Sequence, residues 1–195
     1  MQLLQSLEAG SQIHHLAITL YSALGLGRLY LETGNLAAAQ THLGEVVTIT
    51  QGNGFKTFEL AARALLAAVG TRGGELDGAA THLLRAQEIL SNGEDWRGLA
   101  AEVHLAEGIV ATAQRRWPEA EAAFRKAAAI SGQYHVPYYE ARFLLEWGEM
   151  YLSRNGPGDR DKGMELLDQA LATFQRIQAK KMVEKVLGRK ELLKA

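Results

Sequence analysis

The stretch "LAAAQTHLGEV" at residues 36–46 returns 40 residues later as "LDGAATHLLRA" at residues 76–86, with Leu, Ala, Thr, His and Leu in matching places. Both stretches space their apolar residues three or four positions apart, as on one face of an α-helix. Self-similarity at a fixed period is typical of repeat proteins, in which each unit buries its apolar face against the next. The stretch therefore predicts a repeated helical unit.

Columns of residues follow the same period along the chain. Small residues recur inside apolar helical segments at Gly27, Ala67, Gly108 and Gly148. Each is followed by three further columns: Ala39, Ala79, Ala120 and Gly163; Leu43, Leu83, Phe124 and Leu167; and Val46, Ala86, Ala127 and Ala170. A glycine inside a helix costs about 1 kcal/mol relative to alanine, so its recurrence indicates a packing reason. We expect each unit to be a helical hairpin in which two small residues, such as Gly108 and Ala120, touch.

The columns resemble those of the tetratricopeptide repeat (TPR), in which a large residue, Gly and an aromatic residue precede Ala, a large apolar residue and Ala. The fourth unit matches this pattern through Leu144, Trp147, Gly148, Tyr151, Leu167 and Ala170. The period departs from the usual length of about 34 residues, and the Pro expected near the end of the second helix is absent. Longer helices account for both departures, as in the superhelical domains of large bacterial signalling proteins. The resemblance implies an all-α fold, a right-handed superhelical array of antiparallel helix hairpins (a TPR-like α-solenoid).

We expect one domain over residues 1–195. Its repeats cover 12–51, 55–91, 95–132 and 137–177, with helices at 12–33 and 35–51, 55–72 and 75–91, 95–114 and 117–132, and 137–154 and 160–177. A capping helix follows at 180–193, with Met182, Val183, Val186 and Leu187 on one face. The insertion "NGPGD" at 155–159 is placed in a surface loop. Residues 1–10 are interpreted as the remnant of a preceding helix, because Leu3 aligns with Leu43, and the chain as the C-terminal part of a larger protein. The alternative is that residues 1–8 fray.

The composition narrows the class of protein. The 21 Lys and Arg nearly balance the 22 Asp and Glu, so a net charge of -1 gives no broad positive field, and we expect no nucleic-acid partner. The absence of cysteine excludes disulfides and thiolate chemistry. Neither a membrane-spanning apolar run nor a signal peptide is recognisable. We expect a cytoplasmic protein without a membrane contact.

Few residues are candidates for a catalytic, metal-binding or nucleotide-binding site, and we expect that the protein is not an enzyme. His42 and His82 occupy one column of neighbouring units, too far apart to share a metal ion, and are interpreted as solvated or partly packed. His14 and His15 diverge on a helix, and His104 and His135 are interpreted as structural. The glycines of "GLGRLY" at 25–30 follow no strand, so they do not form a nucleotide-binding motif. We expect no catalytic residue, no metal site and no cofactor.

The resemblance implies binding on the concave face, which the first helices of the hairpins line. Carried over position by position, the partner-binding residues are Tyr21, Leu24, Arg28, Glu32, Arg72, Glu102, Leu105, Ile109, Arg142, Leu145 and Glu149. The Lys and Asn clamp of co-chaperone members is absent, because those positions hold Leu24, Arg28, Ala64 and Ala68. Such a face fits an amphipathic helix or a partner domain. The alternative is that Leu24, Leu105, Ile109 and Leu145 pack between adjacent repeats.

The C-terminal segment around 141–186 is similar to the end of bacterial signalling proteins in which a nucleotide cyclase or kinase-like module and a regulatory ATPase precede a TPR array. This similarity implies a non-catalytic regulatory scaffold that binds a protein or peptide partner, or upstream domains of its own chain. Two alternatives remain open. One is a free-standing domain for a small ligand or nucleic acid, with basic residues of the segment 180–194 as contacts. The other is an array that self-associates through its N-terminal repeat edge.

Overall fold

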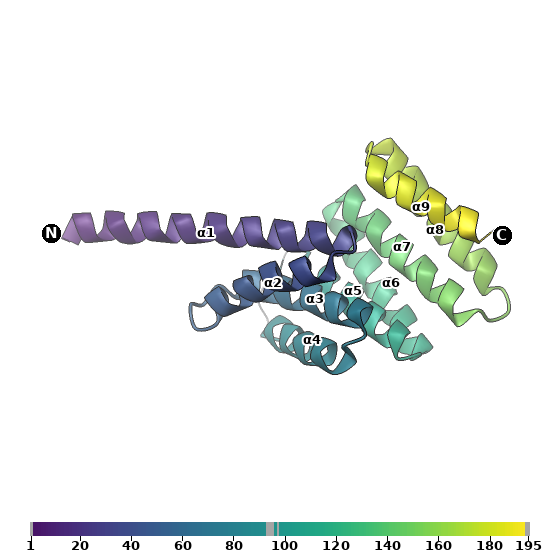
Figure 1. The fold of residues 1–195 in the computed structure, drawn as a ribbon, viewed down its shortest axis with the longest axis horizontal. Helices are drawn as coiled ribbons and strands as arrows, with labels where there is room; N and C mark the ends of the chain where they lie inside the picture. Colours follow the sequence, from purple (N-terminus) through teal and green to yellow (C-terminus); the bar gives the residue numbers. More distant parts are fainter. Residues whose placement is uncertain (1, 93–95, 97, 194–195) are drawn as a thin grey trace. The chain divides into compact units, whose positions relative to one another are not determined.

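A computed structural model describes residues 2–92, 96 and 98–193, with side chains from His15 onward. The described residues fold into helices and contain no strand, which confirms the all-α class. The helices, shown in Figure 1, are α1 (Gln2–Glu32), α2 (Leu36–Thr50), α3 (Lys56–Gly73), α4 (Leu76–Leu90), α5 (Leu99–Ala113), α6 (Trp117–Tyr134), α7 (Pro137–Arg154), α8 (Asp159–Arg176) and α9 (Lys180–Leu192). None of the described helices combines the length and the apolar character that crossing a bilayer requires.

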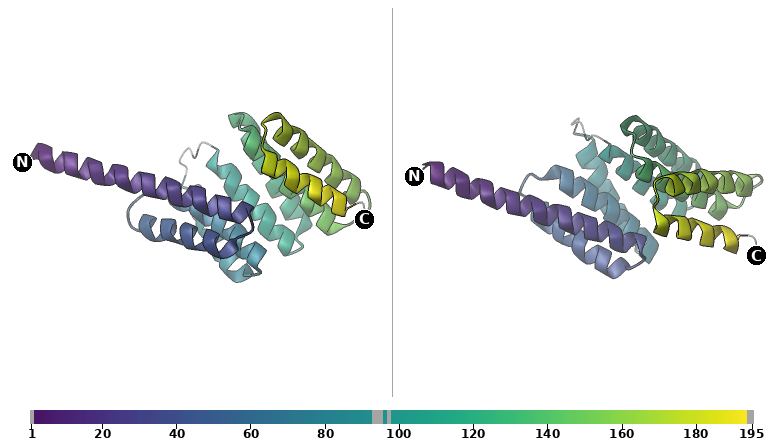
Figure 2. Two further views of the ribbon diagram at one scale, coloured as in Figure 1. Left: turned by 45° about the horizontal axis from the view of Figure 1, so that its top comes forward. Right: turned by 90° about the horizontal axis from the view of Figure 1, so that it is seen from above.

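The chain divides into two compact units, Met1–Gly93 (unit 1) and Glu94–Ala195 (unit 2). In unit 1, α1 pairs with α2 and α3 with α4; in unit 2, α5 pairs with α6, α7 with α8, and α9 packs on α8 (Figure 2). Consecutive helices therefore form the predicted hairpins. The boundary falls between the second and third predicted repeats, so that no repeat is divided. One domain over 1–195 and a right-handed superhelix stay predictions.

The N-terminal helix is longer than predicted. The predicted first helix at 12–33 is too short, because α1 runs without a break from Gln2 to Glu32 and extends well beyond α2 (Figure 1). The stretch around Gly10 contains no proline, and a single glycine lowers the stability of a helix by only about 1 kcal/mol. Gly10 alone is therefore not sufficient to end the helix.

The remaining helix ends lie close to the predicted ones, with two differences around α5 and α6. The predicted start at 95 lies outside the described residues, and α5 begins at Leu99, after Gly98 in a left-handed conformation with φ 88°. A left-handed residue cannot belong to a right-handed helix, which sets the start of α5. At the other end, α6 continues past the predicted 132 to Tyr134 and stops at His135, which is itself left-handed with φ 49°.

In two hairpins, the two helices come close where a glycine of the first helix faces a large residue of the second helix. A Cβ atom placed on Gly27 would lie 2.5 Å from Cγ of Leu43, and one on Gly108 would lie 2.7 Å from the ring of Phe124. The prediction that Gly108 chiefly meets Ala120 is therefore wrong. Small residues face each other in the fourth hairpin, where a Cβ on Gly148 would lie 3.0 Å from the carbonyl oxygen of Gly163. At Gly27 and Gly108, the missing side chain thus leaves room for a large residue of the second helix.

Replacing Gly27 by alanine tests this contact. Overpacking costs about 1–3 kcal/mol, against a gain of about 1 kcal/mol in helix propensity, so Gly27→Ala should lower the free energy of unfolding by about 1 kcal/mol. The matched control is Gly44→Ala in α2, where a Cβ would meet nothing within 4 Å. We expect that variant to be more stable than the wild type by about 0.5–1 kcal/mol. Urea unfolding measures both; equal stabilities would show that Leu43 moves aside freely.

In α3 and α7, the opposite face of the helix packs on the preceding hairpin of the same unit. From α3, the ring of Phe58 meets Tyr21 of α1 edge-on at 4.8 Å, and Arg72 Nη1 donates to the Leu31 carbonyl at 3.4 Å. From α7, Arg142 reaches Glu102 of α5 and Arg154 reaches Glu121 of α6. A first helix thus has two packing faces, one for its own partner and one for the preceding hairpin.

The turns that close the four hairpins form a further column. Gly34 and Gly74 of unit 1 have φ 81°, whereas Arg115 and Asn155 hold the corresponding places in unit 2 with φ 57° and 52°. In three of them the next amide donates back to the helix, as in Arg116 N to the Ala111 carbonyl at 2.9 Å. These bonds are typical of a left-handed helix cap, which glycine adopts most easily.

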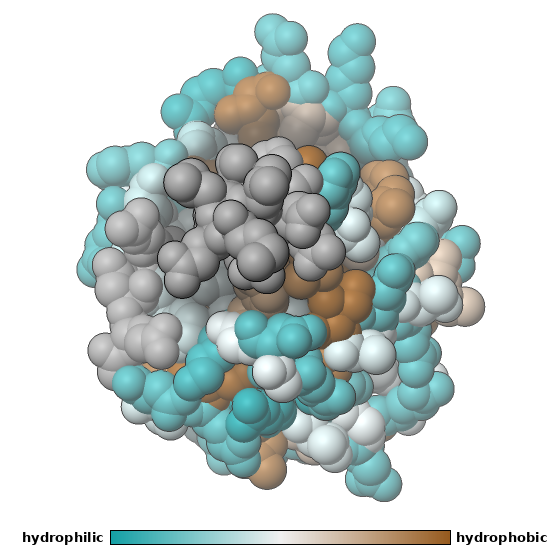
Figure 3. All heavy atoms as spheres, turned by 90° about the vertical axis from the view of Figure 1, so that its left-hand side faces the viewer, coloured by the Kyte–Doolittle hydropathy of each residue, from teal (hydrophilic) through white to brown (hydrophobic). Residues whose placement is uncertain are grey.

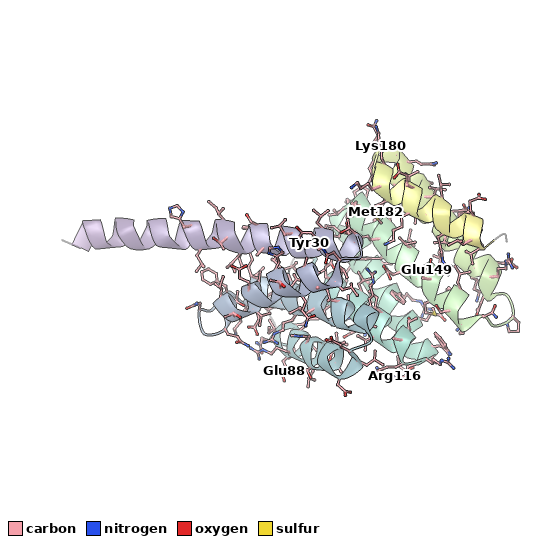
Figure 4. All side chains as sticks on the ribbon, viewed as in Figure 1. Tyr30, Glu88, Arg116, Glu149, Lys180 and Met182 are labelled. Atoms are coloured by element: carbon pink, nitrogen blue, oxygen red, sulfur yellow. The ribbon has the colours of Figure 1, made fainter. Side chains whose placement is uncertain are left out.

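The last hairpin and α9 enclose one apolar cluster. Met182 and Val186 of α9 pack against Leu145 of α7 and Phe174 of α8; Met182 is labelled in Figure 4. This contact agrees with the predicted capping helix. Leu187, however, is exposed, which corrects its assignment to the packed face. It follows Val186 by one position and so points about 100° away around the helix.

Candidate protein-binding surface

In unit 1 the structure brings the predicted partner-binding residues onto one surface. Tyr21, Leu24, Arg28 and Glu32 follow each other at intervals of three or four along α1, so they share a face of the helix. Tyr21 is exposed and the other three are half-buried. Arg72 of α3 lies beside them, because its guanidinium donates to the main chain of α1 at Leu31. Two hairpins therefore contribute to this surface, which we name the Tyr21–Arg72 face.

In unit 2 most of the predicted residues are buried. Leu105, Ile109 and Leu145 belong to the core, in agreement with the alternative that such residues pack internally. Leu24, named with them, is only half-buried. Glu102 and Arg142 are also buried, and they form an ion pair with 3.1 Å between Arg142 Nη1 and Glu102 Oε1. A partner could reach these side chains only after a rearrangement.

Glu149, the last predicted residue, binds the capping helix. Arg189 of α9 donates to both carboxylate oxygens of Glu149, with distances of 2.8–3.0 Å; Glu149 is labelled on α7 in Figure 4. The hydrogen bond to this carboxylate raises the pKa of the Arg189 guanidinium. The next residue, Lys190, pairs with Asp168 of α8. Two of the basic residues considered as contacts for nucleic acid are therefore engaged in holding α9 to α7 and α8.

A cluster in the loop before α8 was not anticipated from the sequence. Arg154 holds both oxygens of the buried Asp159 at 2.6 and 2.7 Å, and the amide of Gly156 donates to the same carboxylate at 2.8 Å. The hydrogen bonds from Arg154, reinforced by the one from Gly156 against the effect of burial, lower the pKa of Asp159 to about 2. Residues 155–158 of "NGPGD" form a loop as predicted, whereas Asp159 is the first residue of α8 and anchors this loop.

The stability of the protein should depend on pH through Asp159. Because the pKa of its carboxyl is lower in the folded than in the unfolded chain, the ionised form stabilises the fold above about pH 4, and this contribution is lost as the pH falls toward about 2. The difference corresponds to about 2 kcal/mol. We expect Asp159→Asn to lose about this amount at pH 7 and much less near pH 2. Asp161→Asn removes an exposed charge from the same helical turn and is the control; equal losses from both variants would refute the assignment.

Three of the histidines contact other side chains. His42 stacks on Tyr30 with ring centroids 5.5 Å apart, and His82 Nδ1 lies 3.1 Å from Nη1 of Arg63. Burial, with a further contribution from the charge of Arg63, lowers the pKa of His82. Both are half-buried, which confirms the partly packed role. His104 lies 2.7 Å from Glu107.

Among the described residues, no three or more His, Asp or Glu side chains are grouped so that they could hold a metal ion. The sequence matches no protein-family model, and no curated protein matches it significantly. The Tyr21–Arg72 face is therefore judged from its own geometry and chemistry.

Proposed function

We propose that the chain is a non-catalytic regulatory scaffold that binds a protein partner through the Tyr21–Arg72 face. The observation that supports this most directly is the contact of Arg72 with the main chain of α1, which joins side chains of two hairpins in one surface. Tyrosine and arginine are the residues that most often contribute strongly to protein interfaces. A surface supported by two packed hairpins also binds with little loss of conformational entropy.

The expected partner is an amphipathic helix or a small domain that presents apolar and acidic side chains together. Tyr21 and Leu24 would contact its apolar side, and the guanidinium groups of Arg28 and Arg72 would recognise carboxylates. Scaffolds of this type regulate an activity located elsewhere, which fits the similarity to TPR arrays of bacterial signalling proteins. We place this role in the cytoplasm and assign no cofactor to it.

Charge reversal on the face tests the proposal. The full chain is used as bait in a lysate of the source organism, and the proteins retained by the wild type and by Arg28→Glu/Arg72→Glu are compared by quantitative mass spectrometry. Lys56→Glu/Arg125→Glu changes the net charge equally at exposed positions of α3 and α6 and is the control. Arg142 is left out because its change would disturb a buried ion pair.

We expect a protein that the wild type and the control retain and the double variant loses by at least about tenfold, which is about 1.4 kcal/mol. Binding of the purified partner is then measured by calorimetry. Equal recovery with all three baits would contradict the role of this face. Retention of nucleic acid, or a thermal shift with a small ligand only, would favour the alternative functions.

A further inference from the structure

The exposed side of α1 carries an apolar stripe. Ile18, Tyr21, Leu26 and Leu29 are 52%, 70%, 39% and 49% exposed. At 100° per residue they lie within an arc of about 140°, with the small residues Ser22 and Gly25 between them. We name these six residues the α1 stripe. Of the exposed large hydrophobic side chains among the described residues, four lie in this stripe, and no other helix carries more than two.

The stripe corresponds to the face that later first helices pack on the preceding hairpin. One period on, the places of Ile18, Tyr21, Leu26 and Leu29 are held in α3 by Phe58, Ala61, Leu66 and Val69, and three periods on, in α7, by Tyr139, Arg142, Trp147 and Met150. None of these eight residues is exposed. The contacts of α3 with α1 and of α7 with α5 arise from this face. The stripe therefore continues, at α1, an interface that the fold uses twice elsewhere.

The charge of the stripe indicates which surface would cover it. All exposed residues of α1 from Ile18 to Leu29 are uncharged, so the complementary surface must be uncharged as well. The exposed side of α9 carries Lys180, Lys181 and Lys185 and does not meet this condition; Lys180 is labelled in Figure 4. Figure 3, seen from the N-terminal side, shows brown hydrophobic surface between polar side chains. Among the described residues, the stripe itself is an uncharged apolar surface that meets this condition.

We propose that two copies of the chain associate through the α1 stripe, helix against helix and antiparallel about a two-fold axis. In this arrangement Ile18 of one copy lies opposite Leu29 of the other, and Tyr21 opposite Leu26. Ser22 then faces Gly25 near the axis, where two small residues allow the helices to approach closely. The stripe is only about 17 Å long, so its contact area is small, and we expect a weak dimer that dissociates at micromolar concentrations. The Tyr21–Arg72 face shares only Tyr21 with the stripe.

Solution mass is the first test. Sedimentation equilibrium of the full chain from about 1 to about 200 µM should show twice the mass of one chain at the upper end and a monomer at the lower end. Leu29→Glu places a carboxylate in the interface and should raise the dissociation constant at least about tenfold. Leu84→Glu is the control, because Leu84 is 59% exposed on α4, outside the stripe. Circular dichroism verifies that both variants remain helical.

Cross-linking tests the antiparallel register. The chain has no cysteine, so introduced thiols are unique, and a Cβ on Gly25 would meet nothing within 4 Å. When Ser22→Cys and Gly25→Cys chains are mixed and oxidised, the mixed disulfide should form in excess over either homodimeric disulfide, as mass spectrometry can measure. Gly44→Cys mixed with Thr48→Cys, on α2, is the control and should not cross-link efficiently.

Each outcome decides the proposal. A monomer at all concentrations overturns it and leaves a different protein as the occupant of the stripe. A dimer that survives Leu29→Glu, or homodimeric disulfides in excess, overturns the proposed interface. Because Arg28→Glu/Arg72→Glu leaves Ile18, Leu26 and Leu29 intact, loss of partner binding with an unchanged dimer separates this proposal from the proposed function.

Discussion

Arg142→Met is expected to lower the free energy of unfolding by about 3–5 kcal/mol, because it leaves the buried carboxylate of Glu102 without its guanidinium. The two side chains are only 6% and 7% exposed, so water cannot take the place of Arg142 without a rearrangement of α5 and α7. Chemical denaturation with far-ultraviolet circular dichroism measures the loss. Glu102, Arg142 and all three tryptophans of the chain belong to unit 2, so tryptophan fluorescence should report the same transition.

The matched variant replaces both charges. Glu102→Leu/Arg142→Met removes the ion pair in favour of side chains of similar volume, a change that is often neutral or stabilising in buried pairs. We expect it to recover most of the stability lost in Arg142→Met. If the double variant were as unstable as the single one, the loss would come from packing around Arg142 and not from the uncompensated charge.

Phe124→Ala is expected to cost about 3–5 kcal/mol, the usual loss for a fully buried aromatic ring. Phe124 is only 1% exposed, and its ring fills the space beside Gly108. The change would leave a cavity between α5 and α6 and should shift the urea midpoint strongly. Leu192→Ala, at a side chain 72% exposed on α9, is the control and should change stability by less than about 0.5 kcal/mol.

The repeat itself provides a compensating variant. The second hairpin holds Ala67 and Leu83 where the third holds Gly108 and Phe124. Gly108→Ala alone should clash with the ring, whereas Gly108→Ala/Phe124→Leu copies the pair of the second hairpin. We expect the double variant to lose less free energy of unfolding than the two single variants lose together. Strict additivity would show that the two positions do not interact.

The hairpins could be predicted from the sequence because two independent signals agree. The apolar columns fix which residues are helical, and glycine or asparagine marks most turns between them. The start of α7 at Pro137 and the cap of α2, where Asn35 accepts from the amide of Ala38 at 3.2 Å, follow from local chemistry alone. These features depend on residues close in the sequence.

The neighbour of each glycine could not be predicted because it depends on tertiary geometry. The columns show that Gly108 needs space, but both Ala120 and Phe124 lie on the facing side of α6. Which of them comes closest is set by the shift of one helix along the other, a difference of about one turn. The predicted start of the first helix after Gly10 was wrong for the opposite reason. A single glycine is a local signal, and it does not end a helix that its neighbours favour.

Two ion pairs between neighbouring helical units were not predicted, although the sequence contains a signal for them. Glu102 and Arg142 are separated by 40 residues, as are Glu149 and Arg189. Opposite charges one period apart occupy one column of neighbouring repeats and can meet wherever these repeats stack. The resemblance to TPR proteins assigned Glu102, Arg142 and Glu149 to a partner, because it predicts which face of a helix these residues share but not what covers that face.

The turn column has a consequence for the order in which the chain folds. A glycine at Gly34 or Gly74 enters the left-handed region without steric cost, so the helices of unit 1 can close into hairpins from local interactions alone. Arg115 and Asn155 enter it at a cost that the surrounding packing must offset. We therefore expect folding to start in the hairpins of unit 1, and those of unit 2 to close only as their cores form.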